Sequence, residues 1–352
     1  MKETQLICKE CQTVFRVQRK TPYCTCGGML GVETLEEELN DEMIQQTNLT
    51  EDHFYRDLSE QKGKQWANTP PVEEVTPLEQ LDSDNEHIYL KLDYKLPENS
   101  YFERTSAWLM KKLKQQAITS IVLTASNYTN LSIARQAEHA SIPCELYIPE
   151  GITSELVTQF RNVGVSIHHF EYQQDDCVDK NVFIATDNHP YLTEGAKIFA
   201  YELWNQLGKC GPDIVVFSLE SGLLILGAYY GFLELQKHNS IKILPKFIIV
   251  DTIPSLKCEG VSLSPSMYKE VTKIIKVTDG HLQTIPTSAV IQAEKALLIR
   301  GHQVNRQSAA AYAGCMRYYR DHSIKNETIV IPLSHMADTE KNFENDGVRN
   351  ER

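Results

Sequence analysis

Hydrophobic and polar residues follow two different periods along residues 87–253. Short apolar or alternating runs, which predict strands, are followed by longer amphipathic segments, which predict helices. The expected strands are residues 87–96, 120–126, 144–150, 165–171, 213–220 and 246–253. The expected helices are residues 101–117, 131–141, 154–164, 193–208 and 222–238. This order is typical of parallel sheets with crossover helices, and the run at 213–220 indicates a second sheet.

The flanking segments lack this alternation. Residues 31–85 are polar and acidic, with helix-like pieces and no strand pattern, and we interpret them as an N-terminal arm. Residues 338–352 are charged and poor in apolar side chains, which predicts a disordered tail.

Composition and charge narrow the class of protein. The 352 residues are 41% hydrophobic, enough for a large core and two lobes. The formal net charge is −12 and no long basic run occurs, which argues against a nucleic-acid or anionic-membrane partner. No apolar run approaches the ~20 residues of a membrane span, and the first residues lack the pattern of a signal peptide. We therefore expect a cytoplasmic globular protein.

Four of the nine cysteines are clustered near the N-terminus. Cys8 and Cys11 form one CxxC knuckle, and Cys24 and Cys26 follow in "CTCGG". Four thiolates on two short knuckles can close a tetrahedral zinc site, and the glycines allow a tight turn around it. The alternative is a set of unpaired reduced thiols. The remaining cysteines are scattered and are interpreted as small buried hydrophobic residues: Cys144, Cys177, Cys210, Cys258 and Cys315.

Several stretches, taken in order, carry a resemblance to a known family. They are "TPL" (76–78), "YLKLDYKLPENSYFER" (89–104), "NHPYLTEGAKIFAYEL" (188–203), "RGHQVNRQSAAAYAG" (300–314) and "IVIPLSHMAD" (329–338). With the cysteine segment before them, they resemble threonine synthase, a pyridoxal-phosphate enzyme of the tryptophan-synthase-β fold type (fold type II).

The resemblance implies an α/β, two-lobed architecture in which parallel sheets are flanked by helices. It places a zinc ribbon at residues 1–30 and the larger lobe at residues 86–104 and 195–337. The smaller lobe is then residues 105–194.

The resemblance also assigns a catalytic lysine, but this chain does not have it there. The family holds its cofactor as a Schiff base on the lysine of Ser-Phe-Lys-Asp-Arg, which corresponds to Ser100–Arg104 here. Phe102 replaces the lysine, and a phenylalanine can neither form an imine nor carry a proton. Lys95 in the preceding turn is an alternative that would need the loop rebuilt. Lys111 and Lys112 lie about two turns further along the helix, which is too far.

A second family motif, Ser-x-Gly-Asn, binds the cofactor ring. The corresponding residues are Ser126, Asn127, Tyr128 and Thr129, so tyrosine replaces the glycine and threonine the asparagine. Asn130 is one residue away and is a possible substitute. We expect the bulk of Tyr128 to occupy the volume of the ring.

The third motif is a glycine-rich turn that binds phosphate through backbone N–H groups. It corresponds to Ser218–Leu223, where only Gly222 is a glycine and Glu220 faces the expected phosphate. One like charge at about 4 Å costs roughly 4 kcal/mol at an effective dielectric constant of about 20. We expect this turn to bind phosphate poorly.

The fourth position is a hydroxyl that faces the pyridine nitrogen from the last strand. The alignment offers Leu333 with Ser334 beside it, and a shift of one residue would restore the hydroxyl. This position does not discriminate between an active and an inactive protein.

These losses favour a non-catalytic, threonine synthase-like pseudoenzyme. We expect that it has lost pyridoxal phosphate. We expect a homodimer, a heterodimer with an active relative, or a protein that binds an amino acid or an anionic metabolite. Ser100 and Arg104 would contact the acid group of that ligand. The alternatives are an active pyridoxal-phosphate lyase whose lysine lies elsewhere, and a cofactor-free enzyme with Glu103 or Glu220 as general base. A purely structural scaffold is a third class.

Overall fold

A computed structural model describes eleven parts of the chain. They are residues 5–16, 23–33, 75–82, 87–96, 99–149, 155–169, 181–186, 189–253, 263–322, 324 and 326–337. Residues 34–74, most of the expected arm, and the expected tail at residues 338–352 lie outside the described residues.

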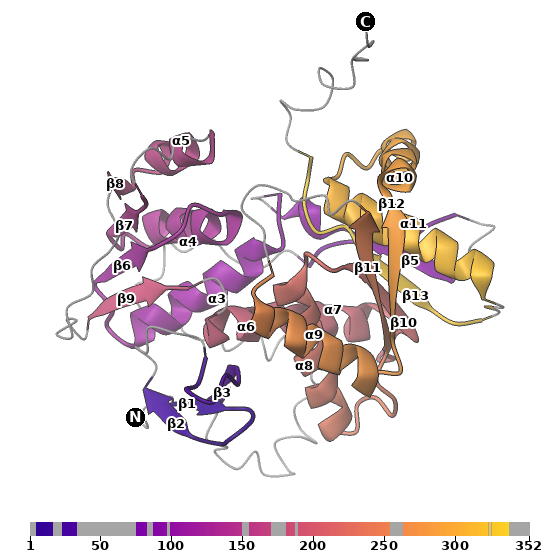
Figure 1. Ribbon diagram of the computed structural model, residues 1–352, viewed down its shortest axis with the longest axis horizontal. Coiled ribbons are helices and arrows are strands. Elements are labelled where there is room, and N and C mark those ends of the chain that lie inside the picture. Colours follow the sequence, from indigo (N-terminus) through magenta and orange to yellow (C-terminus); the bar gives the residue numbers. More distant parts are fainter. Residues whose placement is uncertain are drawn as a thin grey trace, which may run out of the picture.

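The larger of two α/β sheets has six strands in the order β12-β11-β10-β13-β5-β4 (Figure 1). The strands are β4 (Leu78–Gln80), β5 (Ile88–Lys91), β10 (Ile214–Ser218), β11 (Lys246–Ile253), β12 (His281–Pro286) and β13 (Ile329–Pro332). All neighbouring pairs are parallel except β4 and β5, so the sheet is mixed where we expected a parallel one. Every residue of β10 is buried, because helices cover both faces of a parallel sheet.

The smaller sheet is fully parallel, with strand order β8-β7-β6-β9. Its strands are β6 (Ser120–Leu123), β7 (Cys144–Tyr147), β8 (Ser166–His168) and β9 (Val182–Ala185). Helices α4 (Tyr128–His139) and α5 (Glu155–Asn162) are the crossovers of this sheet. The predicted α/β architecture with two sheets flanked by helices is confirmed.

Four helices pack closely where the two sheets meet (Figure 1). They are α3 (Phe102–Gln115), α6 (Pro190–Ala196), α7 (Ile198–Gln206) and α8 (Gly222–Lys237). Glycine is required at two of their contacts. A Cβ atom on Gly195 would lie 2.7 Å from the Thr105 Cα, and one on Gly227 would lie 2.2 Å from the Ala196 Cβ. The glycines therefore allow helix backbones to approach each other more closely than larger residues would.

The larger sheet is completed by three further helices, α9 (Pro265–Val277), α10 (Thr287–Ile299) and α11 (Arg306–Asp321). Buried apolar side chains form two clusters. One includes α8, α9 and the smaller sheet, and the other lies beneath α10 and α11. Among the described residues no helix has the length and apolar character needed to cross a membrane.

A separate three-stranded antiparallel sheet contains the cysteine cluster. Its strands are β1 (Gln5–Cys8), β2 (Val14–Arg16) and β3 (Leu30–Glu33), in the order β2-β1-β3. We call residues 5–16 and 23–33 the ribbon. Strand β3 extends the ribbon three residues past the expected end at residue 30, and the ribbon packs against α6 (Figure 1).

Candidate functional site

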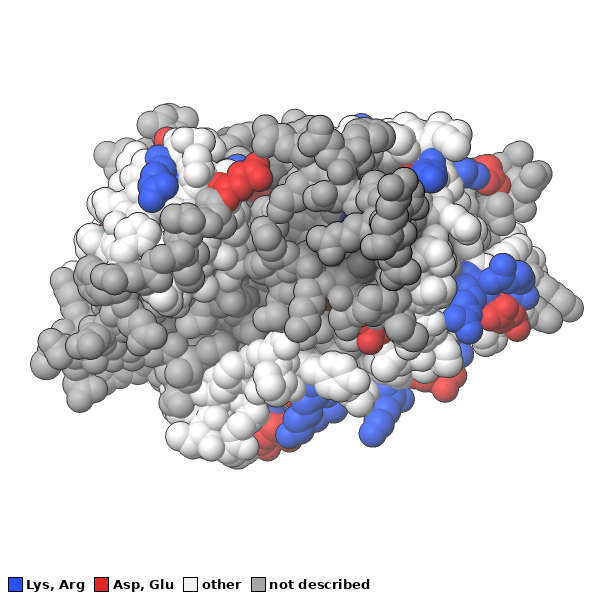
Figure 2. Space-filling model, turned by 45° about the horizontal axis from the view of Figure 1, so that its top comes forward, with Lys and Arg blue, Asp and Glu red and all other residues white. Residues whose placement is uncertain are grey.

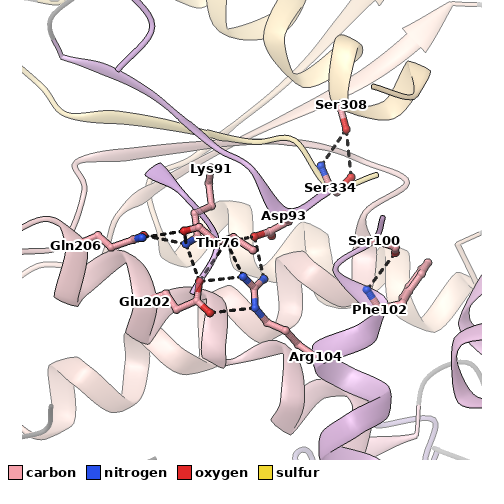
Figure 3. A network of polar contacts seen from close by, with 10 residues as sticks. All are labelled: Thr76, Lys91, Asp93, Ser100, Phe102, Arg104, Glu202, Gln206, Ser308 and Ser334. Carbon is pink, nitrogen blue, oxygen red and sulfur yellow. Dashed lines mark hydrogen bonds and ion pairs between the residues drawn. The ribbon is translucent and has the colours of Figure 1, made fainter. Parts of the chain in front are cut away.

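Phe102 lies in a small aromatic cluster at the first residue of α3. Its side chain is 6% exposed, and its ring centre is 4.4 Å from that of Tyr101 and 5.0 Å from that of His335. A β-bridge between Ser100 and His335 brings these residues together, and the Phe102 N–H donates to the Ser100 Oγ over 3.1 Å (Figure 3). The position assigned to the catalytic lysine is therefore part of the apolar core.

Tyr101 contacts the N-terminus of α8, which the sequence analysis did not foresee. Its side chain is 3% exposed, and its phenol faces the backbone of Leu224 in the first turn of α8. Burial raises the pKa of Tyr101 well above its ordinary value, so the phenol stays neutral. The first N–H groups of a helix have no partner within the helix and are an anion-binding feature. Here a neutral side chain of the same protein lies against this terminus.

The turn before α8 does not resemble a phosphate cradle. The Glu220 carboxylate accepts a hydrogen bond of 2.9 Å from the Gln307 Nε2 on α11. It lines a small hollow of about 10 Å³ together with Ser218, Asp251 and Thr252. A Cβ on Gly222 would lie 2.4 Å from the Leu263 Cδ2, so this glycine allows α9 to pack against α8. Gly222, expected in a ligand cleft, is explained by helix packing.

Arg104 lies in a buried ionic cluster, whereas we expected it to contact a ligand (Figure 3). Its side chain is 2% exposed, its Nη1 donates to the Asp93 Oδ1 over 2.8 Å, and its Nε donates to the Glu202 Oε1 over 3.1 Å. Its Nη2 donates to the Thr76 Oγ1 over 2.7 Å. Because these bonds direct the guanidinium into the core, Arg104 stabilises the fold and is not a ligand contact.

Lys91 completes this cluster. Its Nζ lies 2.6 Å from the Glu202 Oε2 and 2.8 Å from the Gln206 Oε1, and the side chain is fully buried (Figure 3). Burial lowers the pKa of Lys91 despite the nearby Glu202. Burial alone would raise the pKa of Glu202, but Arg104 and Lys91 together hold that pKa below its ordinary value. Two cations and two anions thus balance each other.

The last strand leads into a group of hydroxyls beside the aromatic cluster. Ser334 is 2% exposed, and its N–H donates to the Ser308 Oγ over 2.9 Å (Figure 3). Its Oγ lies 3.0 Å from the His335 Nδ1. Leu333, which the alignment selected, instead belongs to the apolar cluster beneath α10 and α11. Ser334 is therefore the hydroxyl on this side of the sheet. His335, which directly follows Ser334, was not predicted as a site residue.

Polar atoms without a partner gather at the carboxyl end of the smaller sheet. The Asn130 side chain is fully buried and donates to the Ala125 carbonyl over 2.9 Å. Its Oδ1, the Ser126 Oγ and the Thr186 Oγ1 are buried and lack a hydrogen-bond partner within the part of the chain that the structure describes. Ser126 follows β6 and Thr186 follows the adjacent parallel strand β9. Thr186 was not predicted as a site residue.

The other expected residues of this region lie nearby in the sequence. Asn127 caps α4 by accepting the Asn130 N–H over 2.8 Å, which fixes the turn. Thr129 is buried, and Tyr128 packs partly buried against the core. Glu103, an expected general base, is 3% exposed in the first turn of α3.

The four clustered cysteines have the arrangement of a tetrahedral metal site. All four sulfur atoms lie within 4.8 Å of one another, with Cys8 to Cys26 and Cys11 to Cys24 each at 3.5 Å. A tetrahedral zinc site with Zn–S bonds of about 2.3 Å has sulfur atoms about 3.8 Å apart. A Cβ on Gly28 would lie 2.8 Å from the Cys8 sulfur, so glycine makes room for a ligand atom. The residues therefore fit zinc.

Charged side chains on the face shown in Figure 2 are of both signs. Among the described residues of this face, Lys and Arg side chains lie beside Asp and Glu side chains, without a continuous patch of one sign.

The family model described as pyridoxal-phosphate dependent enzyme matches residues 69–335 of this chain. The chain belongs to this family. It is 20% identical to threonine synthase of Methanocaldococcus jannaschii, with 93% of this chain and 90% of that protein covered. It is 22% identical to threonine synthase of Methanosarcina acetivorans, with 72% of each protein covered.

Solved structures share the fold at lower identity. Maize serine racemase has a TM-score of 0.60 at 14% identity, covering 78% of this chain and 92% of that one. Threonine deaminase isoform 2 of Solanum lycopersicum has a TM-score of 0.58 at 17% identity, covering 76% of this chain and 85% of that one. The protein is thus a threonine synthase-like member of fold type II.

The family cofactor does not fit the residues that this chain places in the corresponding positions. Phe102 offers no amine for an imine, and the Tyr101 side chain lies against the helix terminus at which a phosphate would bind. The exposed Lys95 has its ammonium 5.2 Å from the centre of the Tyr94 ring.

Proposed function

We propose that this protein is a non-catalytic, threonine synthase-like protein that has lost pyridoxal phosphate and binds a small polar molecule without turning it over. The observation that carries the proposal is the contact between Tyr101 and the first turn of α8, next to the buried ring of Phe102. Phe102 would thereby take the place of the lysine amine, and Tyr101 would lie where a phosphate would bind.

The smaller sheet supplies the features of a ligand site. The Ser126 and Thr186 hydroxyls and the Asn130 amide oxygen are buried polar atoms whose desolvation is uncompensated, which costs about 1–3 kcal/mol each. A polar ligand would satisfy them. The N-terminus of α4 lies in the same turn and favours a negative group. An amino acid or an anionic metabolite has both properties.

Zinc and a partner chain complete the proposal. Cys8, Cys11, Cys24 and Cys26 would bind zinc as thiolates, which requires a reducing compartment and supports a cytoplasmic protein. The close packing at Gly195 and Gly227 within the chain indicates that the fold is kept despite the altered residues. A chain that keeps the fold would keep the surfaces with which it forms a homodimer, or a heterodimer with an active relative.

Borohydride trapping tests the loss of the cofactor. Purified full-length protein is mixed with pyridoxal phosphate at substoichiometric concentration, reduced, and analysed by intact mass and peptide mapping. An active threonine synthase, treated in parallel, is the positive control. We expect no specific adduct on this chain. A single modified lysine, at Lys95 or elsewhere, would overturn the proposal and identify the residue that holds the cofactor.

A further inference from the structure

The ribbon contacts α8 and α9 through residues that belong to its cysteine knuckles. Lys9, which follows Cys8, has its ammonium 3.0 Å from the centre of the Tyr230 ring on α8. Glu10 forms an ion pair with Lys273 on α9. The geometry of the knuckle therefore determines whether both side chains can reach their partners.

The second knuckle contacts the start of α9. Tyr23 directly precedes Cys24, and its hydroxyl lies 2.7 Å from the Ser264 Oγ. Ser264 is the N-cap of α9 and accepts the Met267 N–H over 3.2 Å. An N-cap contributes about 1 kcal/mol to helix stability. The ribbon thus holds the residue on which the first turn of α9 depends.

Two glycines make these contacts possible. A Cβ on Gly28 would lie 2.6 Å from the Glu10 Cγ, and a Cβ on Gly31 would lie 2.6 Å from the Lys9 Cε. The aliphatic parts of the Glu10 and Lys9 side chains therefore lie over Gly28 and Gly31, where a residue larger than glycine would displace them. This arrangement explains why glycines follow the cysteines in "CTCGGMLG".

Helix α9 in turn packs on the first turn of α8. Leu263 and Met267 occupy the space beside Gly222, and the Leu224 backbone two residues further on contacts Tyr101. Contacts therefore run without interruption from the cysteine cluster, through Ser264 and Met267, to the helix terminus beside the aromatic cluster.

We propose that metal binding by the ribbon holds α9 against the N-terminus of α8, so that zinc occupancy and the order of these two helices are coupled. The inference rests on the proposed zinc site. Without a metal nothing joins the two knuckles at the cysteine sulfurs, and their separation would move Lys9, Glu10 and Tyr23 away from their partners. Coupling of this kind is reciprocal, so weakening the helix contact must also weaken zinc binding.

Hydrogen exchange on the full chain tests the first direction. Bound zinc is counted by elemental analysis, and exchange is then compared between zinc-loaded protein and protein treated with a chelator. We expect amides at residues 222–226 and 266–271 to exchange about tenfold faster without zinc. Helix α4 on the smaller sheet packs on α3, α5 and β7 and should not change.

A matched pair of variants tests the reverse direction. Lys273→Ala removes the partner of Glu10 from the α9 side and leaves every knuckle residue in place. Lys276→Ala removes an exposed lysine from the same helix and is the control. We expect Lys273→Ala to release zinc to a chelator about fivefold or more faster than Lys276→Ala.

The two proposals fail in distinguishable ways. Absence of one bound zinc per chain would overturn the metal site and this inference together. One zinc per chain with equal exchange in both states, or equal release from both variants, would overturn the coupling and leave the metal site intact.

Discussion

Two groups of buried polar side chains in this protein differ in how many of their polar atoms have a hydrogen-bond partner. In the cluster around Arg104 and Glu202, cations, anions and the Thr76 hydroxyl bond one another, and within the described part of the chain only one Asp93 oxygen lacks a partner. At the carboxyl end of the smaller sheet, three polar atoms lack a partner within the described residues.

The difference separates a structural cluster from the proposed ligand site. A buried cluster in which nearly every polar atom is bonded fixes the elements that contribute to it, here β5, the turn after it, α3 and α7. A buried group without a partner destabilises the protein unless something else satisfies it. The residues matched to the family motifs fall on both sides of this division, so a motif alone did not reveal their roles.

Removal of Arg104 should have the largest effect on stability. Arg104→Ala would leave Asp93 and Glu202 buried without their main cation, which costs about 3–5 kcal/mol. Urea denaturation measures this loss. Arg306→Ala is the control, since that ion pair with Glu294 is half exposed and should cost less than about 1 kcal/mol. Equal losses in the two variants would show that the Arg104 cluster does not stabilise the fold.

Glu202 gives the cluster a defined pH dependence. Its pKa is held below the ordinary value of 4.5, so its contribution is present above pH 4.5 and is lost as the pH falls through the lower folded pKa. The difference in free energy of unfolding between wild type and Glu202→Gln should therefore shrink as the pH falls below 4.5. Urea denaturation across pH 3–6 measures it, and a constant difference would contradict the assignment.

Tyr101→Phe should have an intermediate effect. The ring still packs on Phe102, but the phenol hydroxyl that faces the Leu224 backbone is removed, which costs about 1 kcal/mol. Amides in the first turn of α8 should exchange faster than in the wild type, whereas those in α4 should not. Unchanged exchange in α8 would remove the contact that carries the proposed function.

The sequence predicted the regular elements well and the contacts of the site poorly. The runs that correspond to β5, β6, β7, β8, β10 and β11 have clear apolar patterns and were predicted. Strand β12 was missed because only Gln283 and Ile285 are buried in it, and β4 because it has three residues.

The contacts depend on strand order, which periodicity does not contain. Ser126 and Thr186 belong to one end of the sheet because β9 pairs with β6, although β7 and β8 come between them in the chain. The partner of Arg104, Glu202, is 98 positions away in the sequence. The charge of Arg104 suggested a ligand contact, because neither its distance to Glu202 nor its burial can be read from the sequence.

Substitution of the Ser126 and Thr186 hydroxyls should cause the smallest loss of stability, or none, and the most specific effect on binding. Ser126→Ala and Thr186→Val remove buried groups that have no hydrogen-bond partner among the described residues, so the free energy of unfolding should stay the same or rise, by no more than about 3 kcal/mol. Thermal melts of the wild type with amino acids and small carboxylates or phosphates should identify a stabilising compound. Both variants should lose that shift, and their free forms should melt no lower than the free wild type. If the shift persists in both variants, the ligand binds elsewhere. If either variant destabilises the free protein as much as Tyr101→Phe does, the hydroxyl belongs to the structural class and the distinction between the two polar groups fails at that residue.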